Sequence, residues 1–210
     1  MKRIPLIAAI AAVALTGMNC TPASSDVFPM SVGSVWKMDV LFTSVPIIGP
    51  LDTIETGTIV TTAVEKENLA TGGEVVKCKD DTTIHLRTPD STYTSTSYAY
   101  YREDGDWILG YASLDDTTAD TVMVTTPSVG KTWHQGTATM EIVGPEDVTV
   151  PAGTYKGAWK VKFSASAGGT TFNMYYWYAK GTGLVKFYHE WTYIGYSHIL
   201  TRELTSATIK

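Results

Sequence analysis

The chain has 210 residues, of which 44% are hydrophobic, and its formal net charge is −5. This length fits one globular domain that can bury a sufficient core without disulfide staples. Nucleic acid is not an expected partner, because an acidic surface repels phosphates and the sequence contains no basic run.

The first segment of the chain has the features of a secretory signal peptide. Lys2 and Arg3 form a short basic head, and the apolar run 4–15 is shorter than the roughly 20 residues that span a membrane. We expect residues 1–19 to be a lipoprotein-type signal peptide, residues 20–27 a tether and residues 28–210 a single domain. Removal of the signal takes two of the 16 basic residues and leaves 14 against 21 acidic ones, a net charge of −7.

Cys20 stands where a bacterial lipoprotein carries its lipid. The usual pattern has Leu three residues before the cysteine and Gly or Ala directly before it, whereas this chain has Gly17 and Asn19. Stable anchoring needs more than one acyl chain, which a multiply acylated cysteine provides. We expect Cys20 to be lipidated and to attach the protein to the membrane. The alternative is cleavage after Ala23, which would give a soluble secreted or periplasmic protein.

Cys78 is the only other cysteine of the chain. It alternates with Val76 in the stretch EVVKCKD, which predicts a small buried thiol in a strand. A reactive thiol is the alternative.

After Phe28 the chain alternates apolar and polar residues with a period of two. The clearest case is GAWKVKF, where Trp159, Val161 and Phe163 share one face. The same alternation appears in VWKMDVLFT, TIETGTIVTTAVEKE, TFNMYYWYA, GLVKFYHEWTY and SHILTREL. Turn-type stretches separate these runs, and no window shows a helical period. We expect an all-β fold, a single antiparallel sandwich or half-barrel of about a dozen short strands with little or no helix.

The pattern Ser-Val-Gly-x-x-Trp occurs twice, at 31–36 and at 128–133. Gly33 and Gly130 suit a turn with positive φ, and the tryptophan three residues later opens a strand at the edge of the core. The Gly-Lys-Thr in the second copy is not a phosphate-binding loop, because Thr125 replaces the first glycine and a strand follows. Two half-domains of similar plan are an alternative explanation of the repeat.

Three stretches carry a family resemblance: VFPMSVGSVWKM, VTVPAGTYKGAWKV and YYWYAKGTGLVKF. The matching residues are Phe28, Pro29, Gly33 and Trp36, then Val150–Tyr155, then Trp177–Lys186, with Thr182 where Val is commoner. They resemble a loose group of bacterial secreted proteins and lipoproteins and look like the uncharacterised TapB-like envelope family. The resemblance covers roughly a fifth of the chain. It implies an all-β envelope protein, open or half-closed like lipoprotein carriers, and it transfers no catalytic residue.

The residues that could carry chemistry do not form a recognisable site in the sequence. None of the four histidines has metal-ligand spacing, although His189 and His198 could meet across a hairpin. REDGDW, residues 102–107, could bind calcium weakly but reads more simply as an exposed hairpin turn. A Gly-x-Ser-x-Gly nucleophile elbow is absent from the sequence. We therefore expect no catalytic residue, no metal and no cofactor.

Aromatic residues are the most suggestive feature. YAYYREDGDWILGY and MYYWY place rings at consecutive strand positions, so both faces of those strands carry them. One face can be core, and the other must line a cavity, a groove or a contact surface, unless a second layer covers it. The candidate ligand-binding residues are Tyr98, Tyr100, Tyr101, Trp107, Tyr175 and Trp177.

These observations together predict a lipoprotein of the bacterial cell envelope, at the outer membrane or cell surface. Its expected function is non-enzymatic binding of a hydrophobic ligand or an envelope partner protein at an aromatic-lined site. The alternatives are a structural or adhesion protein and a hydrolase of envelope material. An aromatic-walled cavity would favour the binder, and carboxylates or histidines converging in a cleft would favour the enzyme.

Overall fold

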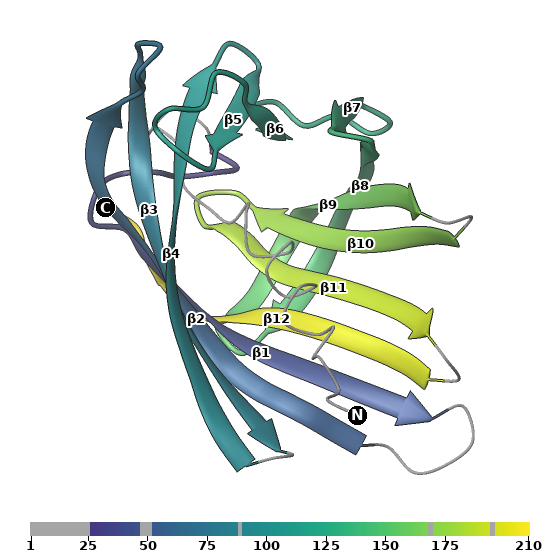
Figure 1. Ribbon diagram of the computed structural model, residues 1–210. Helices are drawn as coiled ribbons and strands as arrows, with labels where there is room; N and C mark the ends of the chain where they lie inside the picture. Colours follow the sequence, from purple (N-terminus) through teal and green to yellow (C-terminus); the bar gives the residue numbers. More distant parts are fainter. Residues whose placement is uncertain (1–25, 47–51, 88–89, 168–169, 194–195) are drawn as a thin grey trace.

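The computed structural model describes residues 26–46, 52–87, 90–167, 170–193 and 196–210 (Figure 1). Every regular element of this part of the chain is a strand, and it holds no helix long and apolar enough to cross a membrane. The expected signal peptide, most of the expected tether and Cys20 lie outside the described residues. Of the tether, Val27 is buried in the core beside Phe28.

Twelve strands make up the fold. They are β1 (Val35–Pro46), β2 (Asp52–Asn68), β3 (Glu74–Arg87), β4 (Asp90–Asp104), β5 (Trp107–Tyr111), β6 (Asp120–Val124), β7 (Thr132–Gln135), β8 (Ala138–Val150), β9 (Gly153–Ala167), β10 (Thr170–Ala179), β11 (Gly183–Tyr193) and β12 (Tyr196–Thr208).

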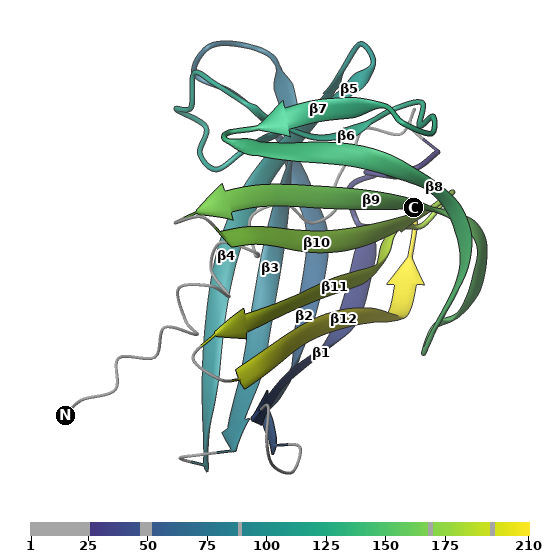
Figure 2. The same cartoon turned by 90° about the vertical axis from the view of Figure 1, so that its right-hand side faces the viewer.

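All twelve strands belong to one antiparallel sheet with the order β6-β5-β4-β3-β2-β1-β12-β11-β10-β9-β8-β7. Strands that follow each other in sequence are neighbours, except β6 and β7, which form the two edges of the sheet. The pair β1–β12 brings the two ends of the chain together. The sheet curls round an interior (Figures 1 and 2). The predicted fold class is confirmed.

The two edge strands of the sheet approach each other through a tryptophan. Trp133 on β7 donates its indole N–H to the carbonyl oxygen of Thr121 on β6 at 2.9 Å. Its ring also meets Trp107 of β5 edge to face, with 6.3 Å between the ring centroids. These contacts bring together the two edges that no backbone ladder joins in the described chain.

Strict alternation explains why the inward face of β1 is apolar. On β1, Trp36, Met38, Val40 and Phe42 are buried, and the residues between them are exposed. A strand presents successive side chains to opposite faces, so one face of β1 covers the core while the other meets water.

The two Ser-Val-Gly-x-x-Trp copies form the same turn. Gly33 has φ of 89° and Gly130 has φ of 80°, as the sequence predicts. Each glycine N–H donates at 2.8 Å to a carbonyl of the next strand of its hairpin, that of Ala63 for the first copy and that of Ile142 for the second. Trp36 and Trp133 are both buried, at 1% and 6% exposure.

A group of polar side chains is buried inside the sheet. Asp80 accepts a hydrogen bond from the Thr61 hydroxyl, and burial raises the pKa of Asp80 to about 6. Arg202 lies over the Phe187 ring, 5.1 Å from its centroid, and burial lowers the pKa of Arg202 to about 10. His189 is 3% exposed, and burial lowers its pKa to about 4.

Cys78 is buried on β3, as predicted, at 1% exposure. It is not a free thiol, because the structure has it in a disulfide.

Candidate binding site

The six predicted site residues do not come together in one place. Tyr98, Tyr100, Tyr101 and Trp107 belong to β4 and β5, whereas Tyr175 and Trp177 belong to β10. In the sheet these groups are separated by β3, β2, β1, β12 and β11 on one side.

The β4–β5 residues are mainly structural. Tyr101 is a core side chain at 1% exposure, and Tyr100 packs against the small cluster around Leu69 and Val75. Trp107 packs against Trp133, as described above. Tyr98 alone is exposed, at 47%.

Tyr175 and Trp177 lie on the outward face of β10, beside a lysine from β9. The Lys160 ammonium lies 5.0 Å from the Tyr175 ring centroid and 4.9 Å from that of Trp177. Trp177 also donates its indole N–H to the Glu146 carboxylate and is only 6% exposed. Trp177 is therefore covered, while Tyr175 keeps part of its surface open to solvent.

An opening lies between β10 and β11 next to Tyr175. The ladder between these strands runs from Ala179 opposite Gly183 to Asn173 opposite Glu190. Beyond it, β10 continues to pair with β9 and β11 continues to pair with β12, so the two strands separate (Figure 1). Beyond the end of the ladder, side chains of both strands line the space between them.

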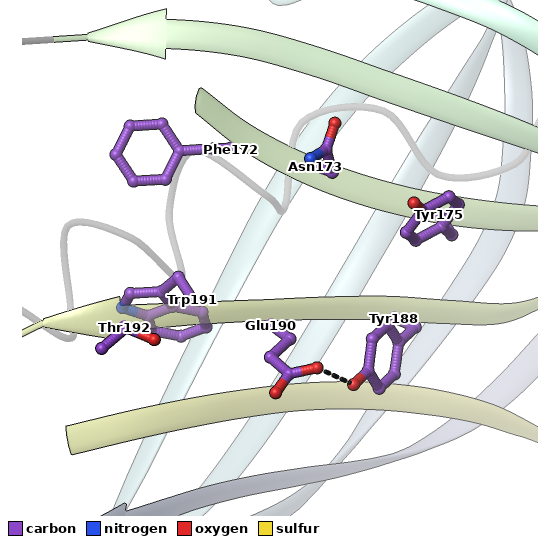
Figure 3. Close-up of a pocket in the computed structure, with 7 residues that line it drawn as sticks. All are labelled: Phe172, Asn173, Tyr175, Tyr188, Glu190, Trp191 and Thr192. Atoms are coloured by element: carbon purple, nitrogen blue, oxygen red, sulfur yellow. Dashed lines mark hydrogen bonds between the residues drawn. The ribbon is translucent and has the colours of Figure 1, made fainter. Parts of the chain in front are cut away.

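A pocket of about 440 Å³ occupies this opening (Figure 3). Its lining residues are Phe172, Asn173, Tyr175, Tyr188, Glu190, Trp191 and Thr192. Four of the seven are aromatic and three are polar. Because rings supply contact area and polar groups supply orientation, the composition is that of a small-ligand site.

Glu190 is held in place by hydroxyl groups. Its carboxylate accepts hydrogen bonds from the Tyr188 hydroxyl at 2.6 Å and from the Ser197 hydroxyl at 3.4 Å. Burial and the bond to Glu190 raise the pKa of Tyr188 to about 12, so this tyrosine stays protonated and donates at neutral pH. The pocket therefore has a solvent-exposed carboxylate at its rim, oriented by two hydroxyl groups.

Trp191 is held by a stack of rings from β1, β11 and β12. Its ring centroid lies 4.5 Å from that of His189, 5.1 Å from that of His198 and 5.7 Å from that of Phe42. The cross-strand pairing of His189 with His198 raised in the sequence analysis does not occur: His189 lies opposite Leu200 and His198 lies opposite Trp191, whose ring contacts both imidazoles. Within the described residues no group of three or more His, Cys, Asp or Glu side chains could hold a metal ion.

Six of the seven lining residues were not predicted: Phe172, Asn173, Tyr188, Glu190, Trp191 and Thr192. Among them, Tyr188 lies directly opposite Tyr175. The stretch GLVKFYHEWTY does predict a strand. Its sequence does not show the register of that strand with the preceding one across the KGTGL turn, and this register sets the cross-strand partners.

No family model matches the chain, and no curated protein matches it in sequence. Two solved structures are similar to it. One is a candidate exported protein with a YmcC-like fold from Bacteroides fragilis, 13% identical, with a TM-score of 0.46 over 88% of this chain and 99% of that one. The other is a candidate lipoprotein from Parabacteroides distasonis, 14% identical, with a TM-score of 0.44 over 91% of this chain and all of the other. Likeness at this level carries no functional argument, and the TapB-like resemblance stays a prediction.

Proposed function

We propose that the protein is an exported, non-enzymatic binding module of the bacterial cell envelope, and that its ligand site is the pocket between β10 and β11. The observation that carries this proposal is the pocket lining of four aromatic and three polar side chains. A hydrolase would need a second acid or base near Glu190. The seven described lining residues contain one carboxylate and no histidine, which favours binding.

A fluorescent apolar molecule tests the site. N-phenyl-1-naphthylamine is neutral and brightens when it leaves water, so it reports entry into an aromatic pocket. We expect it to bind the wild-type protein and to bind Tyr175→Ala about tenfold more weakly, because a contacting ring is lost.

Tyr98→Ala is the matched control for this experiment. Tyr98 is also an exposed tyrosine next to a lysine, since the Lys77 ammonium lies 5.1 Å from its ring, but it belongs to β4. Its removal should leave binding of the dye unchanged. Equal loss in both variants, or no binding to the wild type, would contradict the proposed site.

Export to the envelope is the second part of the proposal. Cys20 is the only cysteine in the sequence besides the disulfide-bonded Cys78. A sulfur that carries lipid through a thioether cannot also form a disulfide, so a lipidated Cys20 could not be the disulfide partner of Cys78 in the same molecule. Disulfides persist outside the reducing cytoplasm, so either form fits an exported protein.

Alkylation of the mature, unfolded protein separates the two forms. A lipid-anchored protein has an added lipid mass and a Cys78 that is alkylated without reduction, and Cys20→Ser releases it from membranes. A disulfide-bonded secreted protein is alkylated only after reduction. An uncleaved chain with both thiols reduced would contradict export.

A further inference from the structure

We propose that the pocket between β10 and β11 binds a ligand through a positively charged alkylammonium group, held between aromatic rings and the Glu190 carboxylate. This inference rests on the proposed function and names the chemical class of the ligand.

Aromatic rings from both strands line the pocket. Phe172 and Tyr175 of β10 and Tyr188 and Trp191 of β11 line one opening from its two sides (Figure 3). The face of an aromatic ring carries partial negative charge and attracts a cation within about 6 Å of its centroid. Tyr175 and Tyr188 are cross-strand partners on the outward face, which also carries Glu190, so these two rings and the carboxylate can contact one ammonium group together. Phe172 and Trp191 belong to the opposite face and line the opening from the interior side.

The lining of the pocket carries a negative charge. Among the lining side chains that the structure describes, Glu190 is the only acidic or basic one. An anionic ligand would be repelled by this carboxylate and by the ring faces. A neutral ligand can contact the rings but gains no charge attraction from the carboxylate. A cation satisfies both the rings and the carboxylate.

The outward face of β9 and β10 already contains a contact between a cation and aromatic rings. The Lys160 ammonium lies about equally close to the Tyr175 and Trp177 rings, and Glu146 pairs with it at 3.4 Å. Lys160 does not line the pocket. Lys162 stands opposite Tyr175 on β9, on the side away from β11. The neighbouring lysines therefore leave the pocket to an external cation.

The Glu190 carboxylate and the Trp191 ring are held in place before any ligand arrives. The Tyr188 hydroxyl and the Ser197 hydroxyl fix the carboxylate, and the ring stack with His189, His198 and Phe42 fixes Trp191. Such pre-organisation lowers the entropic cost of binding.

Choline and 3,3-dimethylbutan-1-ol are the probes that test this inference. The two molecules have nearly the same shape, and only choline is charged. Binding is measured by titration calorimetry or by ligand-observed NMR. We expect wild-type protein to bind choline at least about tenfold more tightly than the neutral alcohol.

Glu190→Gln removes the charge and keeps the shape. It should weaken choline binding about tenfold and leave binding of the alcohol unchanged. Tyr175→Ala should weaken both, and Tyr98→Ala neither. Thermal unfolding of each variant shows whether it is folded. Equal affinity for the two probes, or choline binding that Glu190→Gln does not change, would overturn the inference.

The outcomes separate this inference from the proposed function. If neutral probes bind in a Tyr175-dependent manner and choline does not, the cation site is wrong and the binding module stands. If neither class binds, both fail. A capped trimethyllysine tests the source of the ammonium group: tighter binding than choline assigns it to a partner protein, and weaker binding assigns it to a small molecule.

Discussion

At the residue scale, two buried titratable groups have opposite effects on stability. The pKa of His189 falls from 6.5 to about 4 in the folded protein, so the unfolded chain binds the extra proton between these values. The pKa of Asp80 rises from 3.8 to about 6, so in that window the folded protein binds it. Lowering the pH from 6 towards 4 therefore costs stability through His189 and adds stability through Asp80.

Variants at the two sites should separate these effects. Asp80→Asn keeps an acceptor for Thr61, and its free energy of unfolding should fall as the pH drops from 6.5 to 4.5, by at most about 1.4 kcal/mol per pH unit. His189→Phe keeps a ring against Trp191, and its stability should rise over the same range. Urea denaturation at several pH values measures both slopes.

Wild-type protein is the reference for these slopes. Burial also raises the pKa of Glu55, which adds the same small contribution to all three proteins. If both variants keep the wild-type slope, the buried environments of His189 and Asp80 do not govern the pH dependence.

Gly57 is required by a close approach between strands. A Cβ atom there would lie 2.2 Å from the Thr83 carbonyl oxygen and 2.7 Å from the Ile84 side chain. Gly57→Ala should therefore cost about 1–3 kcal/mol of unfolding free energy in a denaturant titration. Thr56→Ala changes the exposed residue directly before Gly57 and should alter the unfolding free energy by less than about 0.5 kcal/mol. A similar value for both variants would show that β2 and β3 shift apart freely.

At the element scale, Trp133 connects the two edges of the sheet. Trp133→Ala should cost about 3–5 kcal/mol, because a large buried ring and its contact with Trp107 are lost. Trp133→Phe keeps most of the ring and loses the hydrogen bond to Thr121, so it should cost about 1 kcal/mol. Trp36→Ala should be as costly as Trp133→Ala, since Trp36 is fully buried and donates to the Thr182 carbonyl.

Hydrogen exchange locates the effect of these changes. Loss of protection should concentrate in β5, β6 and β7 for the Trp133 variants and in β1 and the β10–β11 turn for Trp36→Ala. Uniform loss over all strands would mean that the sheet edges do not open as a local unit.

The sequence predicted the strands better than it predicted their faces. Alternation is unambiguous on β1, and Gly33 and Gly130 have the positive φ that their turn requires. On β4, adjacent aromatic residues occupy both faces, so the pattern could not tell that Tyr101 is core while Tyr98 is exposed. The partners of Tyr175 depend on register with β11, and its pocket depends on where that ladder ends, which no local pattern encodes.

At the scale of the whole molecule, the topology is circular apart from one gap. Each strand follows its neighbour, β1 pairs with β12, and only the β6–β7 junction lacks a ladder among the described strands. The halves β1–β6 and β7–β12 are thus two six-strand meanders, and each begins with the same glycine turn. This arrangement is what two half-domains of similar plan would produce.

A circular permutation tests whether the gap is a natural place for chain ends. New ends between Thr126 and Pro127 would cut the chain in the segment that joins β6 to β7. The old ends lie at the same end of the sheet, because the Lys210 N–H donates to the Ser34 hydroxyl and the Asp26 carbonyl accepts from Gly181 beside the Trp36 contact. A short Gly/Ser linker can therefore join residue 210 to residue 26.

The permuted chain should fold faster than the original domain while its stability stays within about 1–2 kcal/mol. In the natural order the β1–β12 pairing, Val35 opposite Thr208, closes nearly the whole chain. After permutation that pairing becomes a local hairpin, and no existing ladder is lost in exchange. Stopped-flow refolding measures the rate, and a cut inside the β8–β9 turn at Pro151 with the same linker is the control. If the Thr126 permutant refolds more slowly or does not fold, the Trp133 bridge between β6 and β7 depends on chain connectivity, and the two edges are one structural unit.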